Sequence, residues 1–125
     1  MIKLSEKKDL TIIANEWDEI CEQRDILIEN NKDFSLTGVN IPCILRQLNY
    51  CNRHRVLDIG CGTGYLTNEL ANICNKVIGI DISKKSIEIA RKKVEKRNVE
   101  FELTSIENYE TSKKFNTCIA NMVLM

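Results

Sequence analysis

Residues 56–64 of the chain have the sequence VLDIGCGTG, a short apolar run that leads into a loop with glycine at alternate positions. Val56, Leu57 and Ile59 suit a strand that is buried in a parallel sheet. Glycine lets the backbone approach a ligand where any Cβ would obstruct it. In a doubly wound sheet this turn lies at the carboxyl edge of the strands, where ligands bind. The stretch therefore predicts an α/β fold with a ligand site at its first strand-to-helix turn.

A second apolar run, residues 76–81, predicts a second buried strand, which ends in Asp81. Asp81 follows Gly60 by 21 residues, close to the spacing at which an acid holds the two hydroxyl groups of a ribose. By itself, Asp81 would more simply favour the start of a helix beside Ser83. In combination with the glycine loop, the interpretation that Asp81 binds the ribose of a nucleoside ligand is the stronger one.

The rest of the chain alternates helices and strands. Two leading helices are predicted from apolar residues spaced three or four apart, and further helices and strands follow the two motifs. The helices are expected at residues 10–28, from about 40, 63–74 and 83–97, and the additional strands at 99–103 and 117–121. This order predicts an α/β fold, with a doubly wound and mostly parallel sheet and right-handed crossovers.

Composition excludes several other classes. The 125 residues suffice for one hydrophobic core, and 43% apolar with 29% charged residues exclude a disordered chain. Eighteen basic and eighteen acidic residues cancel, so no overall field favours nucleic acid or an anionic membrane. No apolar run approaches the roughly 18 residues of a membrane span. The six cysteines form no Cys-x-x-Cys pair, which predicts free thiols, no metal site and a cytoplasmic protein.

Two residues distinguish between nucleoside ligands. The dinucleotide fingerprint Gly-x-Gly-x-x-Gly needs glycine at the position of Tyr65. Asp58 would place a carboxylate near the negative charge of a dinucleotide, whereas it suits a ligand that carries cationic groups. S-adenosyl-L-methionine, with an ammonium and a sulfonium group, meets this requirement. A nicotinamide oxidoreductase is therefore the less favoured alternative.

These motifs resemble those of the class I (Rossmann-like, seven-stranded) S-adenosylmethionine-dependent methyltransferases, especially the small-molecule type with a leading helix pair. Residues 56–64 resemble the first motif of the family, residues 77–83 the second, and residues 115–121 the segment of the fourth strand. The resemblance implies the strand order 3-2-1-4-5-7-6, of which this chain holds 3-2-1-4. It also implies methyl transfer by direct displacement to a small-molecule acceptor.

The resemblance further implies a set of cofactor-binding residues. The glycine loop would surround the methionine part of the cofactor, and Asp58 would face its ammonium group. Asp81 would hold the ribose hydroxyls and Ile82 would pack on the adenine ring, while the segment after the third strand, with Ser105, would contact the adenine edge. No catalytic residue and no metal ligand is implied. The set comprises Asp58, Gly60, Cys61, Gly62, Gly64, Asp81, Ile82, Ser105, Ile106 and Asn121.

Several other features have simpler interpretations. The lysines and arginines of residues 84–97 invite a nucleic-acid role, but no aromatic residues interleave with them to stack bases. A solvated helix face is the better interpretation. His54 precedes the first strand, so it is expected on the surface, away from the ligand edge. The resemblance implies that the leading helices cover the cofactor and help to shape the substrate pocket. Within them Trp17 is expected in the helix core, with a place in the wall of that pocket as the alternative, and Asn121 is expected near the transferred methyl group.

The family architecture needs roughly 200 residues, within the ordinary range of one domain. We therefore expect this chain to be the N-terminal part of an enzyme, with leading helices at residues 1–50 and a Rossmann-like core at 55–125. The fourth strand, within residues 118–124, would then be an apolar edge prone to self-association. The main alternative to an active methyltransferase is a module that binds S-adenosyl-L-methionine without completing transfer.

Overall fold

The computed structural model describes residues 9–48 and 54–121 of the chain. Two leading helices, joined by a short π-helix, precede a four-stranded sheet with two further helices. The helices are α1 (Leu10–Glu29), η1 (Ser35–Asn40), α2 (Ile41–Leu48), α3 (Tyr65–Leu70) and α4 (Lys84–Lys93). The strands are β1 (Arg55–Ile59), β2 (Lys76–Asp81), β3 (Val99–Leu103) and β4 (Thr117–Ala120).

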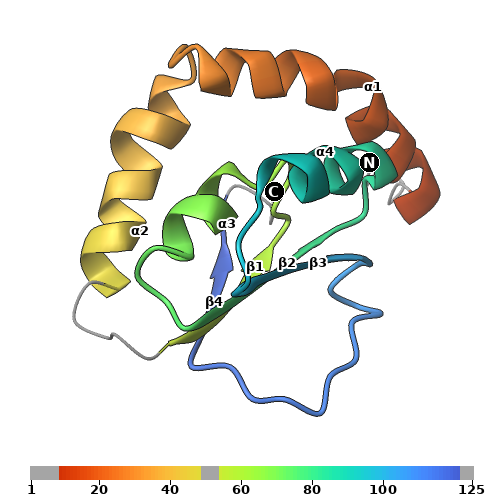
Figure 1. Ribbon diagram of the computed structural model, residues 1–125. Helices are drawn as coiled ribbons and strands as arrows, with labels where there is room; N and C mark the ends of the chain where they lie inside the picture. The colour runs from red at the N-terminus through yellow and green to blue at the C-terminus, as the bar shows by residue number, and fades with distance from the viewer. Residues whose placement is uncertain (1–8, 49–53, 122–125) are drawn as a thin grey trace, which may run out of the picture.

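The sheet has the strand order β3-β2-β1-β4, and each neighbouring pair is parallel. This confirms the predicted α/β fold and its strand order. The register aligns Asp58 of β1 with Gly79 of β2, so both strands reach the same edge. The helices lie on one side of the sheet, and the long connection from β3 to β4 runs on the other (Figure 1). Among the described helices, none is long and apolar enough to cross a membrane.

The leading helices and the sheet share one hydrophobic core. Ile28 of α1 and Leu48 of α2 pack in the same cluster as Val56 of β1, Leu70 of α3 and Val77 of β2. Val56, Leu70 and Val77 have no exposed surface. Burial of a valine or leucine side chain contributes about 1.5–3 kcal/mol. The leading segment therefore folds onto the sheet as part of its core.

Helix α4 ends earlier than the sequence predicts. The prediction runs to residue 97, but the helix stops at Lys93, and Val94 adopts an extended conformation. Val94 packs instead against the cluster of Ala90 and Phe101, which joins α4 to β3. Helix α3 is likewise shorter than predicted and ends at Leu70. After Leu70 the chain continues in turns through Ile73, and the N–H of Cys74 donates to the carbonyl oxygen of Leu70 at 2.9 Å. At the end of α4, by contrast, the packing of Val94 replaces the last predicted turn.

The second leading helix begins close to the predicted residue, but a π-helix that was not predicted precedes it. Residues 35–40 form the π-helix η1 before α2 begins at Ile41. Asp33 supports this segment, because its Oδ1 accepts a hydrogen bond from the N–H of Leu36 at 3.1 Å. The hydroxyl of Thr37 donates to the carbonyl oxygen of Asp33 at 2.9 Å. A side-chain cap thus initiates the helical segment before the apolar pattern does.

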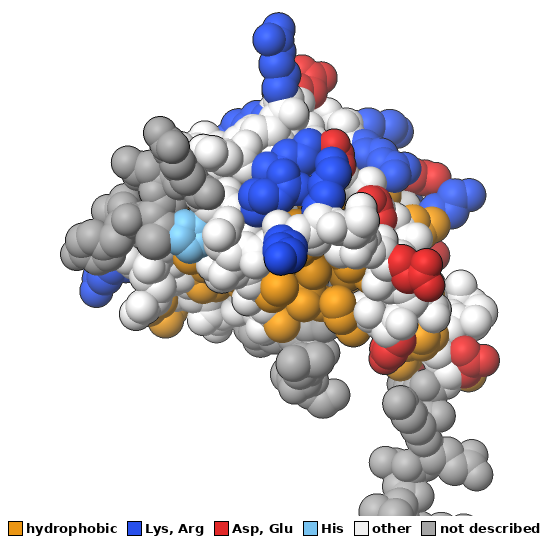
Figure 2. All heavy atoms as spheres, turned by 90° about the horizontal axis from the view of Figure 1, so that it is seen from below, with side chains coloured by type: hydrophobic (Ala, Val, Ile, Leu, Met, Phe, Trp, Pro, Cys, Tyr) orange, Lys and Arg blue, Asp and Glu red, His pale blue; other side chains and the backbone are white. Residues whose placement is uncertain are grey.

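The opposite face of the sheet carries a second apolar cluster. Leu57 of β1 and Ile78 of β2 are buried there, with Tyr109 and Phe115 of the β3–β4 connection packed against them. Figure 2 views the molecule from this side and shows hydrophobic side chains gathered beside basic ones. Cys118 of β4 pairs with Leu57 and is exposed.

Candidate cofactor site

The chain turns sharply after β1 because three loop glycines have positive φ. The φ angles are 70° at Gly60, 55° at Gly62 and 87° at Gly64, in the region that other residues rarely adopt. The N–H groups of Gly60 and Cys61 both donate to the carbonyl oxygen of Ile80, at 2.8 and 3.0 Å. These bonds fix the loop at the carboxyl ends of β1 and β2, as the sequence predicts.

The loop glycines have different surroundings. A Cβ at Gly62 would meet nothing within 4 Å, so this face of the loop is open. A Cβ at Gly64 would lie 3.0 Å from Cζ of Phe101 and 3.2 Å from Cβ of Ala90. Gly62 therefore leaves space for a ligand, whereas Gly64 allows close packing of the loop on α4 and β3.

A cavity of about 450 Å³ opens over the loop, within the size range of small-molecule sites. Its walls are the carboxyl ends of β1 and β2, the segments after β3 and β4, and helix α1. Nine of the ten predicted cofactor-binding residues line it, and Gly64 is the exception. The nine are Asp58, Gly60, Cys61, Gly62, Asp81, Ile82, Ser105, Ile106 and Asn121. The structure thus brings together the residues of four separate sequence segments.

Asp58 lies at the base of the cavity and is almost fully buried. Only 2% of the residue is exposed, and the hydroxyl of Thr67 donates to its Oδ2 at 2.7 Å. The pKa of Asp58 is raised from 3.8 to about 7, mainly by burial and to a smaller extent by the charge of the nearby Asp81, against the opposing effect of the Thr67 hydrogen bond. A cationic group in the cavity would stabilise the ionised carboxylate. The site is therefore suited to bind an ammonium group beside Asp58.

Asp81 lies at the end of β2 with both carboxylate oxygens engaged by the backbone. Oδ2 accepts a hydrogen bond from the N–H of Gly62 at 2.8 Å, and Oδ1 accepts one from the N–H of Ser83 at 2.8 Å. Burial raises the pKa of Asp81, while these hydrogen bonds oppose the shift. Each oxygen keeps a second lone pair, so the carboxylate can still accept two hydroxyl groups. Its orientation is fixed before any ligand arrives.

The segment after β3 forms the other end of the cavity. Ser105 is buried, and its Oγ accepts a hydrogen bond from the N–H of Asn108 at 3.2 Å. The hydroxyl therefore supports the turn of residues 105–108. Ile106 is exposed and lines the cavity with Ile82, and so does Glu107. Two apolar side chains thus border the space that the resemblance assigns to the adenine ring.

Helix α1 supplies a further wall of the cavity, as the resemblance implies for the leading helices. Trp17 was expected in the helix core, but it is 39% exposed and lines the cavity with Leu10 and Ile13. Arg24 also lines it and forms an ion pair of 3.1 Å with Asp33. Among the lining residues that the structure describes, Arg24 alone is cationic. The apolar stripe of α1 was visible in the sequence, but not which of its residues would face the ligand edge.

Other candidates from the sequence lie elsewhere or form no site. His54 does not line the cavity, since it lies just before β1 at the opposite end of the strand. The described cysteines, at positions 21, 43, 61, 74 and 118, are all free thiols, while Cys51 lies outside the described residues. Within residues 9–48 and 54–121, no group of histidine, cysteine and acidic side chains could hold a metal ion.

Comparison with known proteins identifies methyltransferases among the relatives of this chain. Residues 52–125, more than half of the chain, match the family model described as "Methyltransferase domain". The chain is 40% identical over 72 residues to malonyl-[acyl-carrier protein] O-methyltransferase of Acetivibrio thermocellus, and this match covers 56% of the chain and 25% of that protein. It is 38% identical over 96 residues to ubiquinone biosynthesis O-methyltransferase of Pelagibacter ubique, which covers 75% of the chain and 36% of that protein.

A solved structure shares the same fold. The magnesium protoporphyrin IX methyltransferase of Synechocystis, solved with bound S-adenosylhomocysteine, superposes with a TM-score of 0.74 at 22% identity. The match covers 89% of this chain and 57% of that protein. The chain spans about a quarter to a third of the length of the two curated relatives. Its matching motifs and fold place it in the class I S-adenosylmethionine-dependent methyltransferase family.

Proposed function

We propose that the chain binds S-adenosyl-L-methionine in the cavity over the glycine loop and contributes to methyl transfer onto a small-molecule acceptor. The observation that carries this proposal is the placement of two carboxylates on adjacent strands, Asp58 buried and Asp81 half-buried, with an open glycine between them. Asp58 and Asp81 both line the cavity, and the Cβ position of Gly62 faces empty space. A ligand that carries both a cationic group and a diol could bind to the two carboxylates at once, with the cation at Asp58 and the diol at Asp81.

The lining residues fit the chemical groups of this cofactor. Asp58 would receive the ammonium group, and Arg24, as the cationic side chain of the cavity, would receive the carboxylate at the same end. Asp81 would accept the ribose hydroxyls with its two remaining lone pairs. Ile82 and Ile106 would hold the adenine between apolar side chains. A dinucleotide would instead bring phosphate charge toward two acids.

The cofactor would supply an activated methyl group on a sulfonium, which is a good leaving group. The task of the protein is then mainly to orient both reactants and to exclude water. Leu10, Ile13 and Trp17 form an apolar wall on α1 that would exclude water from one side. Asn121, after β4, lies at the cavity edge, where it would contact the acceptor or the transferred group.

Three further expectations form part of the same proposal. Residues 1–50 and 55–125 would act as one domain, which the shared core of Ile28, Leu48 and Val56 supports. The free thiols suit the cytoplasm. The exposed edge of β4, with Cys118, would favour self-association.

Two assays test the proposal. Calorimetry with S-adenosylhomocysteine should give binding at one site per chain, and transfer from labelled S-adenosyl-L-methionine should be screened over small phenolic, carboxylic and amine acceptors. Binding together with transfer would support an active enzyme. Binding without transfer to any acceptor would favour the alternative of a cofactor-binding module. Absence of binding would contradict the proposal.

A further inference from the structure

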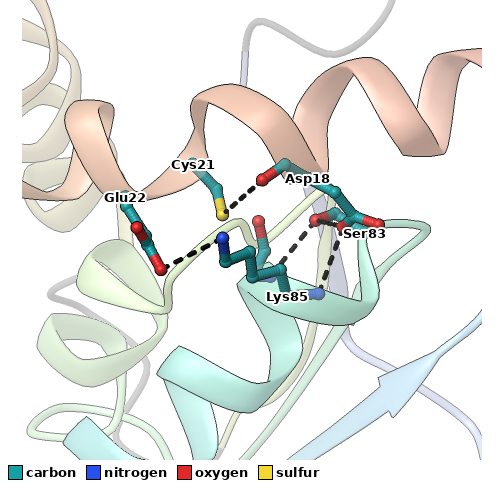
Figure 3. Close-up of polar contacts among 6 residues, drawn as sticks. Asp18, Cys21, Glu22, Ser83 and Lys85 are labelled. Atoms are coloured by element: carbon teal, nitrogen blue, oxygen red, sulfur yellow. Dashed lines mark hydrogen bonds and ion pairs between the residues drawn. The ribbon is translucent and has the colours of Figure 1, made fainter.

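Helix α1 docks on α4 mainly through polar contacts, centred on Asp18 (Figure 3). Oδ1 of Asp18 accepts hydrogen bonds from the hydroxyl of Ser83 at 2.5 Å and from the N–H of Lys85 at 3.1 Å. The ammonium group of Lys85 forms an ion pair of 3.1 Å with Glu22. Asp18 therefore binds the first turn of α4 from a helix that lies 65 residues earlier in the chain.

Ser83 connects Asp18 to the cavity. Its side chain has no exposed surface, and its Oγ also accepts a hydrogen bond from the N–H of Ser86 at 3.1 Å, which caps α4. Its N–H donates to Oδ1 of Asp81, and Oδ2 of Asp81 accepts the N–H of Gly62. An unbroken series of hydrogen bonds thus runs from α1 through the α4 cap to the glycine loop.

We propose that Asp18 is a positioning residue, which acts through Ser83 to hold Asp81 in the orientation that receives the ribose diol. The proposal rests on the function proposed above and extends it to helix α1. It assigns to Asp18 no contact with the cofactor. The position of α1 beside the cavity and the orientation of Asp81 are then set by one network of hydrogen bonds.

The physical reason lies in the buried hydroxyl of Ser83. A hydroxyl has one hydrogen to donate, and Asp18 receives it, which leaves an oxygen lone pair for the N–H of Ser86. Without the half-buried Asp18 the hydroxyl would lose this charged acceptor and would be left unsatisfied or bound to a mobile water, so it would be held less firmly. The turn of residues 81–83 would then shift, and with it the N–H that holds Asp81.

The docking of α1 makes this contact important. Of the described residues of α1, only Cys21 and Ile28 are buried, so apolar packing holds the helix at few points. Asp18 and Trp17 are neighbours on this helix, and Trp17 lines the cavity. A negative charge at the start of α4 is also favoured by the helix dipole. Loss of Asp18 should therefore weaken both the docking of α1 beside the cavity and the hydrogen bonds that orient Asp81.

A double-mutant cycle with Asp81 tests the proposal. Affinity for S-adenosylhomocysteine is measured by calorimetry for the original chain, Asp18→Ala, Asp81→Ala and the double variant. We expect Asp18→Ala to weaken binding about fivefold in the original chain and less than twofold when Asp81 is already alanine. Such non-additivity indicates that Asp18 acts through Asp81. A fivefold loss in both backgrounds would overturn the proposal, because Asp18 would then act on binding by another route.

Two further variants separate positioning from general damage. Asp18→Asn keeps a carbonyl oxygen for Ser83 and should restore binding to within about twofold of the original. Glu19→Ala removes an exposed acid from the next position of α1 and should leave affinity unchanged. Thermal unfolding shows whether each variant is folded. If Asp81→Ala itself leaves affinity unchanged, the ribose role in the proposed function fails, and the positioning role fails with it. If Asp81→Ala weakens binding but the effects of the two substitutions are additive, the proposed function stands and the positioning role of Asp18 fails.

Discussion

The two walls of the cavity are built in different ways. The sheet wall is formed by β1, β2 and the glycine loop, where Val56 and Val77 have no exposed surface and backbone hydrogen bonds fix Gly60 and Cys61. The helical wall is α1, where Trp17 is 39% and Ile20 is 46% exposed. Besides its two buried residues, Cys21 and Ile28, this helix is held by side-chain hydrogen bonds and ion pairs to α4.

This difference separates rigid from adjustable parts of the site. Backbone hydrogen bonds and close packing leave the sheet wall one arrangement, so the acids of this wall are oriented in advance. Exposed polar contacts contribute little each and weaken with salt. Substitutions in the sheet wall should therefore have large effects on stability or affinity, and those on the α1–α4 contact small ones.

The largest effect is expected for Gly64→Ala. The φ of 87° is unfavourable for alanine, and the added Cβ would lie 3.0 Å from Phe101. Backbone strain and overpacking together should lower the free energy of unfolding by about 3 kcal/mol. Gly62→Ala is the matched control, because the backbone strain is similar but the space is open. Denaturant unfolding should show a loss of only about 1 kcal/mol there. Equal losses would contradict the assigned packing role of Gly64.

Asp58→Asn should stabilise the chain without ligand and weaken cofactor binding. The pKa of this acid is about 7 in the folded chain, against an ordinary value of 3.8, so the folded state holds its proton to higher pH. The stability of the original chain should therefore fall as pH rises from about 4 to 7 and then level off. The variant should lack this fall, so its advantage in the free energy of unfolding over the original chain should grow by about 2 kcal/mol between pH 5 and 7.

The same variant should bind S-adenosylhomocysteine more weakly at pH 8, because it lacks the charge that faces the ammonium group. For the original chain, affinity should decrease as pH falls from 8 to 6 and Asp58 becomes protonated. Unfolding curves and calorimetry over this range check both results. If Asp58→Asn is less stable than the original chain at pH 8, the prediction that the buried charge of Asp58 destabilises the fold is contradicted.

A smaller effect is expected for Asp81→Ala. Loss of a bidentate contact to the ribose should weaken S-adenosylhomocysteine binding more than tenfold, which corresponds to about 1.4 kcal/mol or more. Calorimetry measures this loss. The exposed Glu102→Ala, on the neighbouring strand β3, is a control that should bind as the original does. Unchanged affinity in Asp81→Ala would contradict the proposed contact between Asp81 and the ribose.

The smallest effect is expected for Lys93→Met. Lys93 pairs with Asp25 and Glu29 of α1, and about a third of its side chain is exposed. The loss should lower the free energy of unfolding by less than about 1 kcal/mol, and less again in 1 M salt. Denaturant unfolding at two salt concentrations measures it. A loss as large as that in Gly64→Ala would contradict the contrast between the two walls.

The sheet wall could be predicted from the sequence because its signals are local. Apolar runs specify β1 and β2, glycines specify the turn, and Asp58 and Asp81 stand directly at the strand ends. Gly64 was an exception, since its environment depends on Phe101 from a distant strand. The spacing of glycines alone does not distinguish a ligand contact from a packing contact.

The helical wall could not be predicted to the same extent. The periodicity of α1 indicates an amphipathic helix, but not which apolar residues face the core and which face the cavity, as Trp17 shows. The contact between Asp18 and Ser83 joins residues that are 65 positions apart, and no local pattern marks it. Ends of helices differed for the same reason, because Val94 packs on β3 instead of extending α4.

The most direct measurement is a calorimetric comparison of two ligands on the original chain. In the proposed site S-adenosylhomocysteine would present an ammonium group to Asp58 and a ribose to Asp81, whereas NAD would bring phosphate charge toward the same acids. We expect binding of S-adenosylhomocysteine at one site per chain and no measurable heat with NAD. Tight binding of NAD without a response to S-adenosylhomocysteine would contradict the proposed cofactor and the roles of both acids.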